Sequence, residues 1–238
     1  MDIPLLKSFL ESGWVGQAIL IILFFASIFS WSIIIYKYKL LRQCRQAQRM
    51  FLSRFRSAAR GVFKLSSPRL SREVDPFYAV YEKGCRDLHF TRGTEPENRV
   101  NDPAAWGRLE ESLQRTADAE IGFLRKNLIF LATAASTGPL LGILGTVYGV
   151  LIAFQGMGKY GSATIDAVAP GISQALNTTV FGLIVAIPAL IAYNYFSHTV
   201  NGISADLDNF IWEFLEKAKS HSSRGENRRQ DHSTALKT

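Results

Sequence analysis

Three long stretches without a charged side chain constrain this 238-residue chain more than any other feature. No Asp, Glu, Lys or Arg occurs from Ser12 to Tyr36, from Asn127 to Gly158, or from Ala167 to Ala205. A helix needs about 20 apolar residues to cross a hydrocarbon core about 30 Å thick, so each stretch predicts a membrane span. The second and third exceed one crossing at ~1.5 Å per residue, which predicts helices that project beyond the bilayer.

The basic residues between the first two stretches set the predicted orientation. Eleven Lys and Arg residues and no acidic residue lie between positions 37 and 72, and positive residues beside a span stay in the cytoplasm. The only charged residues in the connection between the second and third stretches are Lys159 and Asp166. We therefore expect the N-terminus outside and the C-terminus inside. The basic segment is expected to attract anionic membrane lipid and not nucleic acid, because no nucleic-acid-binding motif accompanies it.

Amphipathic stripes extend the spans into polar segments and predict a cytoplasmic helical bundle. Apolar residues recur there at three- and four-residue steps. We expect an intramolecular core first and subunit contact second. The stripes are Leu41, Cys44, Gln48, Phe51, Phe55, Ala58 and Val62, then Leu109, Leu113, Ala117, Ile121, Leu124, Leu128 and Leu131, each continuous with its span, and finally Ile203, Leu207, Phe210, Phe214 and Ala218.

Between the stripes, a short helix is expected from Pro76 to Leu88, and Asp102 is expected to cap a helix that begins at Pro103. The polar tail from about Ser220 is expected to be disordered. The predicted fold is an all-α integral membrane protein. Its parts are a periplasmic N-terminus (1–13), transmembrane helix 1 (14–36), a cytoplasmic helical domain (37–126), transmembrane helix 2 (127–158), a periplasmic loop (159–166), transmembrane helix 3 (167–197), and a cytoplasmic helix with a disordered tail (198–238).

The second and third spans are rich in small and polar residues, whereas the first is rich in Leu, Ile and Phe. Glycines spaced three or four residues apart let helix backbones approach closely. The small and polar residues therefore serve either in helix–helix packing alone, or as a hydrophilic lining or a docking surface for another helix. We favour the second interpretation because the polar set is dense on two spans. The packing set is Gly138, Pro139, Gly142, Gly145, Gly149, Pro170, Gly171, Gly182 and Pro188.

The sequence gives no indication of an enzyme, a cofactor or a metal site. Its four histidines are scattered, and neither a nucleophile triad nor a phosphate-binding loop is present. Cys44 and Cys85 lack metal-ligand spacing and are expected to be ordinary reduced thiols. Ion-driven membrane machines generally use an ionisable group within the membrane. If this chain handles protons, the titrating carboxylate must come from another chain.

Short motifs on the second and third spans resemble the TolQ/ExbB/MotA family of motor-channel subunits. They are GTVYG at 145–149, VAPGI at 168–172, and AIPA at 186–189 with the Tyr-Asn pair at 193–194. The specific likeness covers roughly residues 127–197. Three spans and a very short outer N-terminus resemble the TolQ branch more than the ExbB branch, and MotA members have four spans.

The resemblance implies a motor driven by the proton-motive force in a Gram-negative inner membrane. Family members form a homo-pentamer around a dimer of single-span partners, TolR-like or ExbD-like, each with one membrane Asp. Motion passes to a periplasm-spanning protein, TolA-like or TonB-like; the TolQ branch serves outer-membrane integrity and cell division. The alternatives are an ExbB-type subunit for nutrient uptake, a non-conducting scaffold, and a self-sufficient ion channel.

The resemblance also implies site residues. Thr146 and Thr179 match the family's two pore threonines, and Pro139 and Pro188 match its span prolines. Gln174 stands where many members carry an acidic residue, and a neutral amide cannot titrate. Asn177 and Thr178 replace smaller or apolar residues. The expected proton-pathway or partner-facing set is therefore Thr146, Gln174, Asn177, Thr178 and Thr179.

Overall fold

The computed structural model describes residues 14–57, 75–92, 103–160 and 165–235, and their regular structure is helical throughout. The chain divides into two compact units. Residues 1–38 and 126–197 form the span unit, and residues 39–125 and 198–238 form the bundle unit. The helices are α2 (Trp14–Ser57), α3 (Pro76–Arg92), α4 (Pro103–Arg125), α5 (Leu128–Tyr160) and α6 (Ile165–Ala235).

Three helices are long and apolar enough to cross a membrane, as predicted from the uncharged stretches. The qualifying segments are Trp14–Ser57, Leu128–Gly156 and Val168–His221. Helices α2 and α6 continue without interruption into the polar sequence and reach 44 and 71 residues. The predicted extension of these two spans as long helices is confirmed, and the orientation across the membrane stays a prediction.

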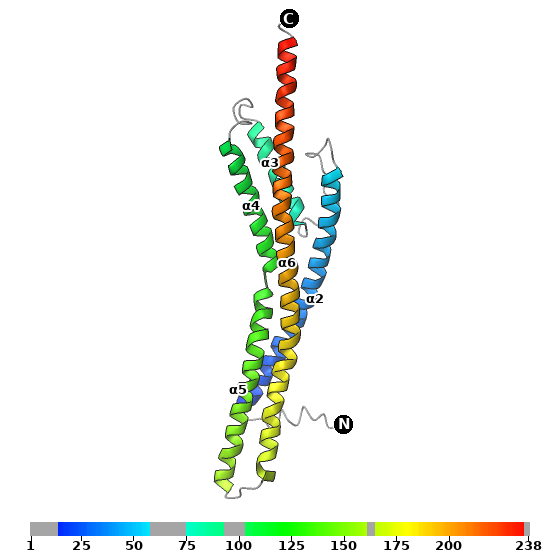
Figure 1. Ribbon diagram of the computed structural model, residues 1–238. Helices are drawn as coiled ribbons and strands as arrows, with labels where there is room; N and C mark the ends of the chain where they lie inside the picture. The colour runs from blue at the N-terminus through cyan, green and yellow to red at the C-terminus, as the bar shows by residue number, and fades with distance from the viewer. Residues whose placement is uncertain (1–13, 58–74, 93–102, 161–164, 236–238) are drawn as a thin grey trace. The chain divides into compact units, whose positions relative to one another are not determined.

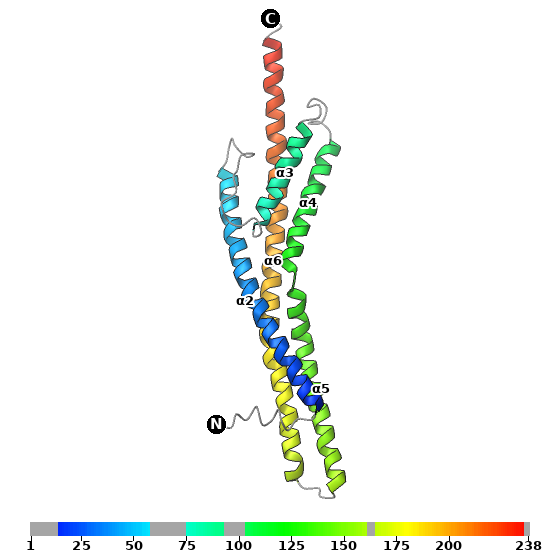
Figure 2. The same ribbon diagram turned by 180° about the vertical axis from the view of Figure 1, so that it is seen from behind.

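The span unit consists of α5, the first part of α6 and the first part of α2. Helix α5 runs beside α6, and the first half of α2 packs across the pair (Figures 1 and 2). Ile19 and Leu23 of α2 form a buried cluster with Val185 of α6. Farther along α2, the ring of Phe29 lies 6.0 Å from that of Phe130 on α5. One face of α2 is therefore buried against both other helices.

The helix expected to run unbroken into the second span is interrupted by a two-residue turn. Helix α4 ends at Arg125, and α5 begins at Leu128. Asn127 adopts φ 69°, a left-handed conformation that Asn tolerates better than most residues and that commonly ends helices. The expected continuity is therefore wrong at this point, although Leu124 and Leu128 are both buried as the stripe predicts.

The bundle unit is built around aromatic rings from three helices. Phe51 and Phe55 of α2, Tyr81 of α3, and Phe210 and Phe214 of α6 are all buried. The Phe55 and Phe210 rings meet edge to face with centroids 4.9 Å apart, an arrangement that stabilises aromatic pairs beyond their burial. All stripe residues in the described ranges are buried, which confirms the amphipathic prediction; Ala58 and Val62 lie outside those ranges.

Helix α3 is capped by a buried carboxylate. Asp75 Oδ1 accepts hydrogen bonds from the backbone N–H groups of Phe77 (3.1 Å) and Tyr78 (3.2 Å), the usual role of an N-cap residue. The helix begins at Pro76 as predicted but continues to Arg92, four residues beyond the expected end. Helix α4 begins at Pro103 as expected, whereas Asp102 lies outside the described residues.

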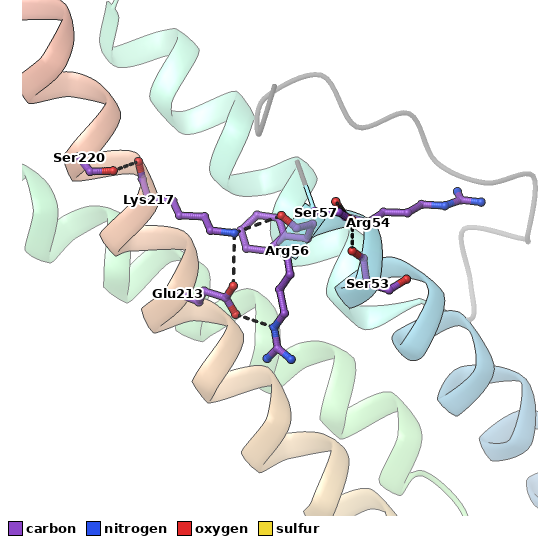
Figure 3. A network of polar contacts seen from close by, with 8 residues as sticks. Ser53, Arg54, Arg56, Ser57, Glu213, Lys217 and Ser220 are labelled. Atoms are coloured by element: carbon purple, nitrogen blue, oxygen red, sulfur yellow. Dashed lines mark hydrogen bonds and ion pairs between the residues drawn. The ribbon is translucent and has the colours of Figure 1, made fainter. Parts of the chain in front are cut away.

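A lysine on α6 holds the end of α2 (Figure 3). Lys217 Nζ donates a 3.1 Å hydrogen bond to the carbonyl oxygen of Phe55 and lies 4.3 Å from the centroid of its ring. The same ammonium pairs with Glu213 at 3.3 Å, and Glu213 also pairs with Arg56 at 3.2 Å. Carbonyl groups in the last turn of a helix lack partners in the helix, so Lys217 supplies one and ties α2 to α6.

The polar tail differs from its expectation, because α6 is helical to Ala235. Extending an existing helix adds one backbone hydrogen bond for each residue fixed, and the unfavourable nucleation step is already complete. Polar composition alone therefore did not predict the end of α6.

Candidate functional site

Glycines on α5 allow it to approach α6 closely. A Cβ atom on Gly142 would lie 2.8 Å from Thr179 Cα, and one on Gly149 would lie 2.7 Å from Ala175 Cβ. One on Gly138 would lie 3.0 Å from the carbonyl oxygen of Gly182. Real Cβ atoms do not approach other heavy atoms at 2.7–2.8 Å. The contact between α5 and α6 therefore depends on the absence of side chains at these positions.

Helix α6 contributes glycines to the same contact. A Cβ on Gly182 would lie 2.5 Å from the carbonyl oxygen of Gly138, and one on Gly171 would lie 2.9 Å from Ala153 Cβ. The contact thus runs from Gly138 near the start of α5 to Ala153 near its end. We call this surface, formed by Gly138, Gly142, Gly145, Gly149 and Ala153 of α5 with Gly171, Ala175, Thr178, Thr179, Gly182 and Ala186 of α6, the glycine seam.

Thr178, expected on the partner-facing surface, lies inside the glycine seam. The residue is only 2% exposed and packs directly against Gly145. Its single hydroxyl proton is shared between the carbonyl oxygen of Ala175, 2.7 Å from Oγ1, and that of Gly142 across the seam, 3.2 Å from Oγ1. A buried, hydrogen-bonded hydroxyl between two helices is a packing group, so this position belongs with the packing set.

The side chains of Thr146 and Thr179 lie at the edge of the glycine seam, to which Thr179 contributes only its backbone. Each follows by one residue a member of the Gly145–Thr178 contact, and one residue turns the side chain by ~100° around a helix with 3.6 residues per turn. Thr146 is half-buried, and its Oγ1 donates to the carbonyl oxygen of Ile143 on its own helix at 2.7 Å. Thr179 Oγ1 is buried without a hydrogen-bond partner among the described residues.

Gln174 and Asn177 precede Thr179 on α6, and both are half-buried. Among the prolines, Pro139 lies inside α5, whereas Pro170 and Pro188 lie inside α6, and both helices continue through them. A proline removes one backbone hydrogen bond from a helix interior. The sequence-predicted residues thus form one band along α5 and α6, with the glycines and Thr178 inside and Thr146 and Thr179 at the margin.

Two buried polar groups on α2 were missed by sequence reasoning. Ser30 is buried, and its Oγ has no hydrogen-bond partner among the described residues. Lys37 is only 1% exposed. Ser30 and Lys37 are seven residues apart, as are Leu23 and Ser30, so all three lie on the buried face of α2. The first span is rich in Leu, Ile and Phe, and this composition does not reveal which of its polar residues fall on the buried face of the helix.

The cysteines offer no reactive group. Cys44 is fully buried, and burial raises the pKa of its thiol to about 12, with Asp75 and Glu120 adding to the effect. Burial also raises the pKa of Cys85. Nucleophilic and metal-binding cysteines act as thiolates with lowered pKa values. Within the described residues no group of three His, Cys, Asp or Glu side chains could hold a metal ion.

Comparison with known proteins assigns this arrangement to a family. The sequence pattern of the MotA/TolQ/ExbB proton channel family matches residues 82–209, which include α4, α5 and all the site residues of α6. The chain belongs to the MotA/TolQ/ExbB proton channel family. This match agrees with the likeness inferred from the short motifs of α5 and α6, and it extends into the bundle unit.

Relatives within the MotA/TolQ/ExbB family come from two of its branches. The Tol-Pal system protein TolQ of Haemophilus influenzae is 35% identical over 214 residues, which cover 90% of this chain and 92% of that protein. TolQ of Pseudomonas aeruginosa is 34% identical over 188 residues, 77% of this chain and 78% of that protein. The biopolymer transport protein ExbB of Xanthomonas campestris is 40% identical over 102 residues, 43% of this chain and 40% of that protein.

Proposed function

We propose that this chain is the TolQ-type subunit of an inner-membrane motor driven by the proton-motive force. Five copies surround a dimer of a TolR-like single-span partner whose membrane Asp carries the proton. The resulting motion acts through a TolA-like periplasm-spanning protein on outer-membrane integrity and cell division. The chain itself is non-enzymatic and binds no cofactor.

One observation carries the proposal: hydroxyl groups line the margin of the glycine seam in spans that contain no carboxylate. Thr146 and Thr179 can accept or donate hydrogen bonds, but neither titrates in the physiological range. Ion-driven membrane machines generally use an ionisable group at membrane depth, and the three uncharged stretches contain no Asp, Glu, Lys or Arg. A carboxylate from a partner helix would complete the site. Thr179 Oγ1 has no hydrogen-bond partner in the described chain but is buried within it, so the carboxylate would reach this oxygen only after the side chain turns outward.

The extent of similarity supports the TolQ branch over the ExbB branch. Similarity to the two TolQ proteins spans 78–92% of their length, whereas the ExbB match from Xanthomonas spans 40% of that protein at slightly higher identity. The segment that this chain shares with ExbB supports a motor core common to the two branches. An ExbB-type role in energising nutrient uptake is therefore the second candidate.

Substitution of the marginal threonines tests the proposed motor function. Thr146→Ala or Thr179→Ala is expected to abolish detergent resistance in a complemented deletion strain while the protein still assembles, because each removes a hydroxyl from the proposed partner surface. Thr133→Ala is the matched control: Thr133 is exposed on α5, and its Oγ1 donates to the carbonyl oxygen of Ile129 at 2.9 Å. Normal detergent resistance in both site mutants, at normal expression, would contradict the proposal.

Native mass spectrometry of the complex, gently extracted from its own membranes, tests the proposed assembly. Five copies with two copies of a single-span, Asp-bearing protein are expected. A homomer without such a partner would leave the site without a titrating group and would favour the scaffold or the lone channel. Deletion phenotypes separate the two branches: detergent sensitivity indicates the TolQ type, and loss of iron-siderophore uptake indicates the ExbB type.

A further inference from the structure

Helix α2 presents a row of arginines in the bundle unit that has no ionic partner among the described residues. Arg42, Arg45 and Arg49 are exposed, and none forms an ion pair in the part of the chain that the structure describes. Their spacing of three and four residues places them on one face of the helix. No acidic residue occurs between positions 37 and 57 to neutralise them. An unpaired basic row of this kind is complementary to an acidic surface elsewhere.

Lipid headgroups do not reach Arg49, the far end of this row. Arg49 lies thirteen residues beyond Tyr36, the last residue of the first uncharged stretch, which is ~20 Å along a helix. The headgroup region extends only about 5–8 Å beyond the hydrocarbon core, and screening limits electrostatic reach to ~8 Å at physiological ionic strength. Anionic lipid therefore accounts for the lysines near the membrane exit but not for Arg49.

The opposite flank of the bundle unit carries acidic residues. Helices α2 and α4 lie on either side of α6 in both views (Figures 1 and 2). Asp118 on α4 and Glu216 on α6 are exposed, and neither has an ion-pair partner in the described ranges. Trp212, one turn before Glu216, is 65% exposed and adds a large apolar surface, which is typical of residues that anchor protein contacts.

The basic and acidic flanks lie at the same height along α6. Gln48 of α2 donates to Asp206 at 2.6 Å, and Gln114 of α4 donates to Asp208 at 3.0 Å. Arg49 follows Gln48 by one residue, and Asp118 lies one turn beyond Gln114. The two side chains are therefore within about one helical turn (~5.4 Å) of each other in height. In a ring of copies around an axis along the helices, rotation preserves height, so only residues at one height can meet.

We propose that the Arg42–Arg45–Arg49 row of one copy docks on the Asp118-bearing α4–α6 flank of the next copy. Different surfaces on opposite sides of one unit make a head-to-tail contact, which closes into a ring when the rotation between copies permits. The inference rests on the proposed oligomeric function and adds to it the residues that join the subunits outside the membrane. Arg49 and Asp118 form its central pair.

Disulfide trapping in the full-length protein in its own membranes tests this contact. The double variant Arg49→Cys/Asp118→Cys is expected to give an oxidant-dependent ladder of covalent dimers and larger species that disappears on reduction. The matched control is Arg54→Cys/Asp118→Cys. Position 54 is five residues from Arg49, so it faces ~140° away on α2, and little ladder is expected. Both variants retain Cys44 and Cys85, so any background from them is common to the two.

Charge reversal supplies a second, independent measurement. In the same membranes, Arg49→Glu is expected to lower the yield of oligomer on native electrophoresis severalfold, and adding Asp118→Arg is expected to restore it. Glu111→Arg is the control reversal on α4, because Glu111 already pairs with Arg115 at 2.6 Å within the chain. Restoration by the Asp118 reversal but not by the Glu111 reversal would support the pairing.

The outcomes separate this contact from the motor proposal. An intact oligomer in the double-cysteine variant without a ladder, or an equal ladder in the Arg54 control, would overturn the contact and leave the motor proposal standing. Loss of binding to phosphatidylglycerol vesicles in Arg49→Glu, with the oligomer unchanged, would assign the arginines to lipid and would also overturn it. Absence of any oligomer in wild-type membranes would refute the assembly itself.

Discussion

Replacing Gly142 by alanine tests whether α5 and α6 are held together through the glycine seam. The new methyl carbon would lie 2.8 Å from Thr179 Cα and 3.2 Å from the carbonyl oxygen of Thr178. Carbon atoms attract best at about 3.5–4.0 Å, so the helices must separate by most of an ångström. Both obstructing atoms belong to the backbone, which cannot rotate away as the end of a flexible side chain could.

The expected cost of this substitution follows from two opposing effects. Overpacking of a close contact costs about 1–3 kcal/mol, and separation also weakens the 3.2 Å hydrogen bond from Thr178 to the carbonyl oxygen of Gly142. Alanine regains up to about 1 kcal/mol through its higher helix propensity. We expect a net loss of about 1–2 kcal/mol, which for a chain of this size lowers the melting temperature by roughly 2–8 °C.

Thermal unfolding of the purified full chain in mild detergent measures this loss, with intrinsic fluorescence as the signal. Gly156→Ala is the matched control on the same helix, because a Cβ atom there would meet nothing within 4 Å. The control is expected to melt at or slightly above the wild-type temperature. If Gly142→Ala melts together with Gly156→Ala, α5 and α6 do not meet at this distance, and the packing role assigned to the glycines fails.

Substitutions at three further positions test individual contacts by thermal unfolding of the full chain. Thr178→Val should cost about 1 kcal/mol, because it removes a buried hydroxyl that makes hydrogen bonds; an unchanged melting temperature would refute its packing role. Lys217→Met keeps most of the apolar stem but loses the hydrogen bond to the Phe55 carbonyl, so its free energy of unfolding is expected to fall by about 1 kcal/mol. The control is Lys219→Met at an exposed neighbouring position, which is expected to lose less. Burial raises the pKa of Asp75, so the folded chain binds the carboxyl proton of Asp75 more tightly than the unfolded chain does. Protonation of Asp75 therefore stabilises the folded chain at low pH, and this stabilisation is lost as pH rises through the pKa of the folded state. Asp75→Asn should therefore flatten the stability profile above the ordinary carboxyl pKa of 3.8, whereas Asp75→Ala should lose the α3 cap, at about 0.5–2 kcal/mol; identical profiles for wild type and Asp75→Asn would contradict this.

Helical periodicity predicted the fold well because it depends on burial alone. A stripe such as Leu109, Leu113 and Ala117 must face a core in any arrangement of the chain, and all three are buried. The same argument predicted three long apolar helices from uncharged stretches. It did not predict the turn at Lys126–Asn127, because Asn is acceptable both inside a helix and in the left-handed conformation that ends one. The local sequence permits both, and the surrounding structure selects the second.

The candidate site was less accessible to sequence reasoning, since it depends on which side of a helix meets which neighbour. Thr178 and Thr179 are adjacent and chemically identical, yet the hydroxyl of the first is hydrogen-bonded inside the seam, and that of the second is buried without a hydrogen-bond partner among the described residues. Similarly, Ser30 lies in a span of apolar composition but falls on its buried face. Composition and spacing identify the polar residues of a span. Only the packing of α2, α5 and α6 shows which hydroxyl groups are hydrogen-bonded within the fold and which are not.

The unpartnered hydroxyl of Thr179 leads to a prediction in which stability and function move in opposite directions. A buried polar atom without a hydrogen bond costs about 1–3 kcal/mol, and the carbonyl oxygen of Ala175, one turn earlier on α6, already accepts from Thr178. Thr179→Val removes the unsatisfied oxygen at nearly constant shape. We therefore expect the purified chain to unfold at the wild-type temperature or a few degrees above it, in contrast to Thr178→Val.

The same Thr179→Val variant is expected to fail in detergent-resistance complementation, because the hydroxyl proposed to meet the partner's carboxylate is gone. A protein retains a destabilising local feature where function requires it. Replacing such a feature keeps or raises the stability of the chain while function is lost. Thr179→Ser is the matched control, since it keeps the oxygen and is expected to keep function. If Thr179→Val destabilises the chain as much as Thr178→Val, its hydroxyl is satisfied within the fold and serves packing. If it complements fully, the hydroxyl is dispensable, and the partner's carboxylate must be met by Thr146 or by another group.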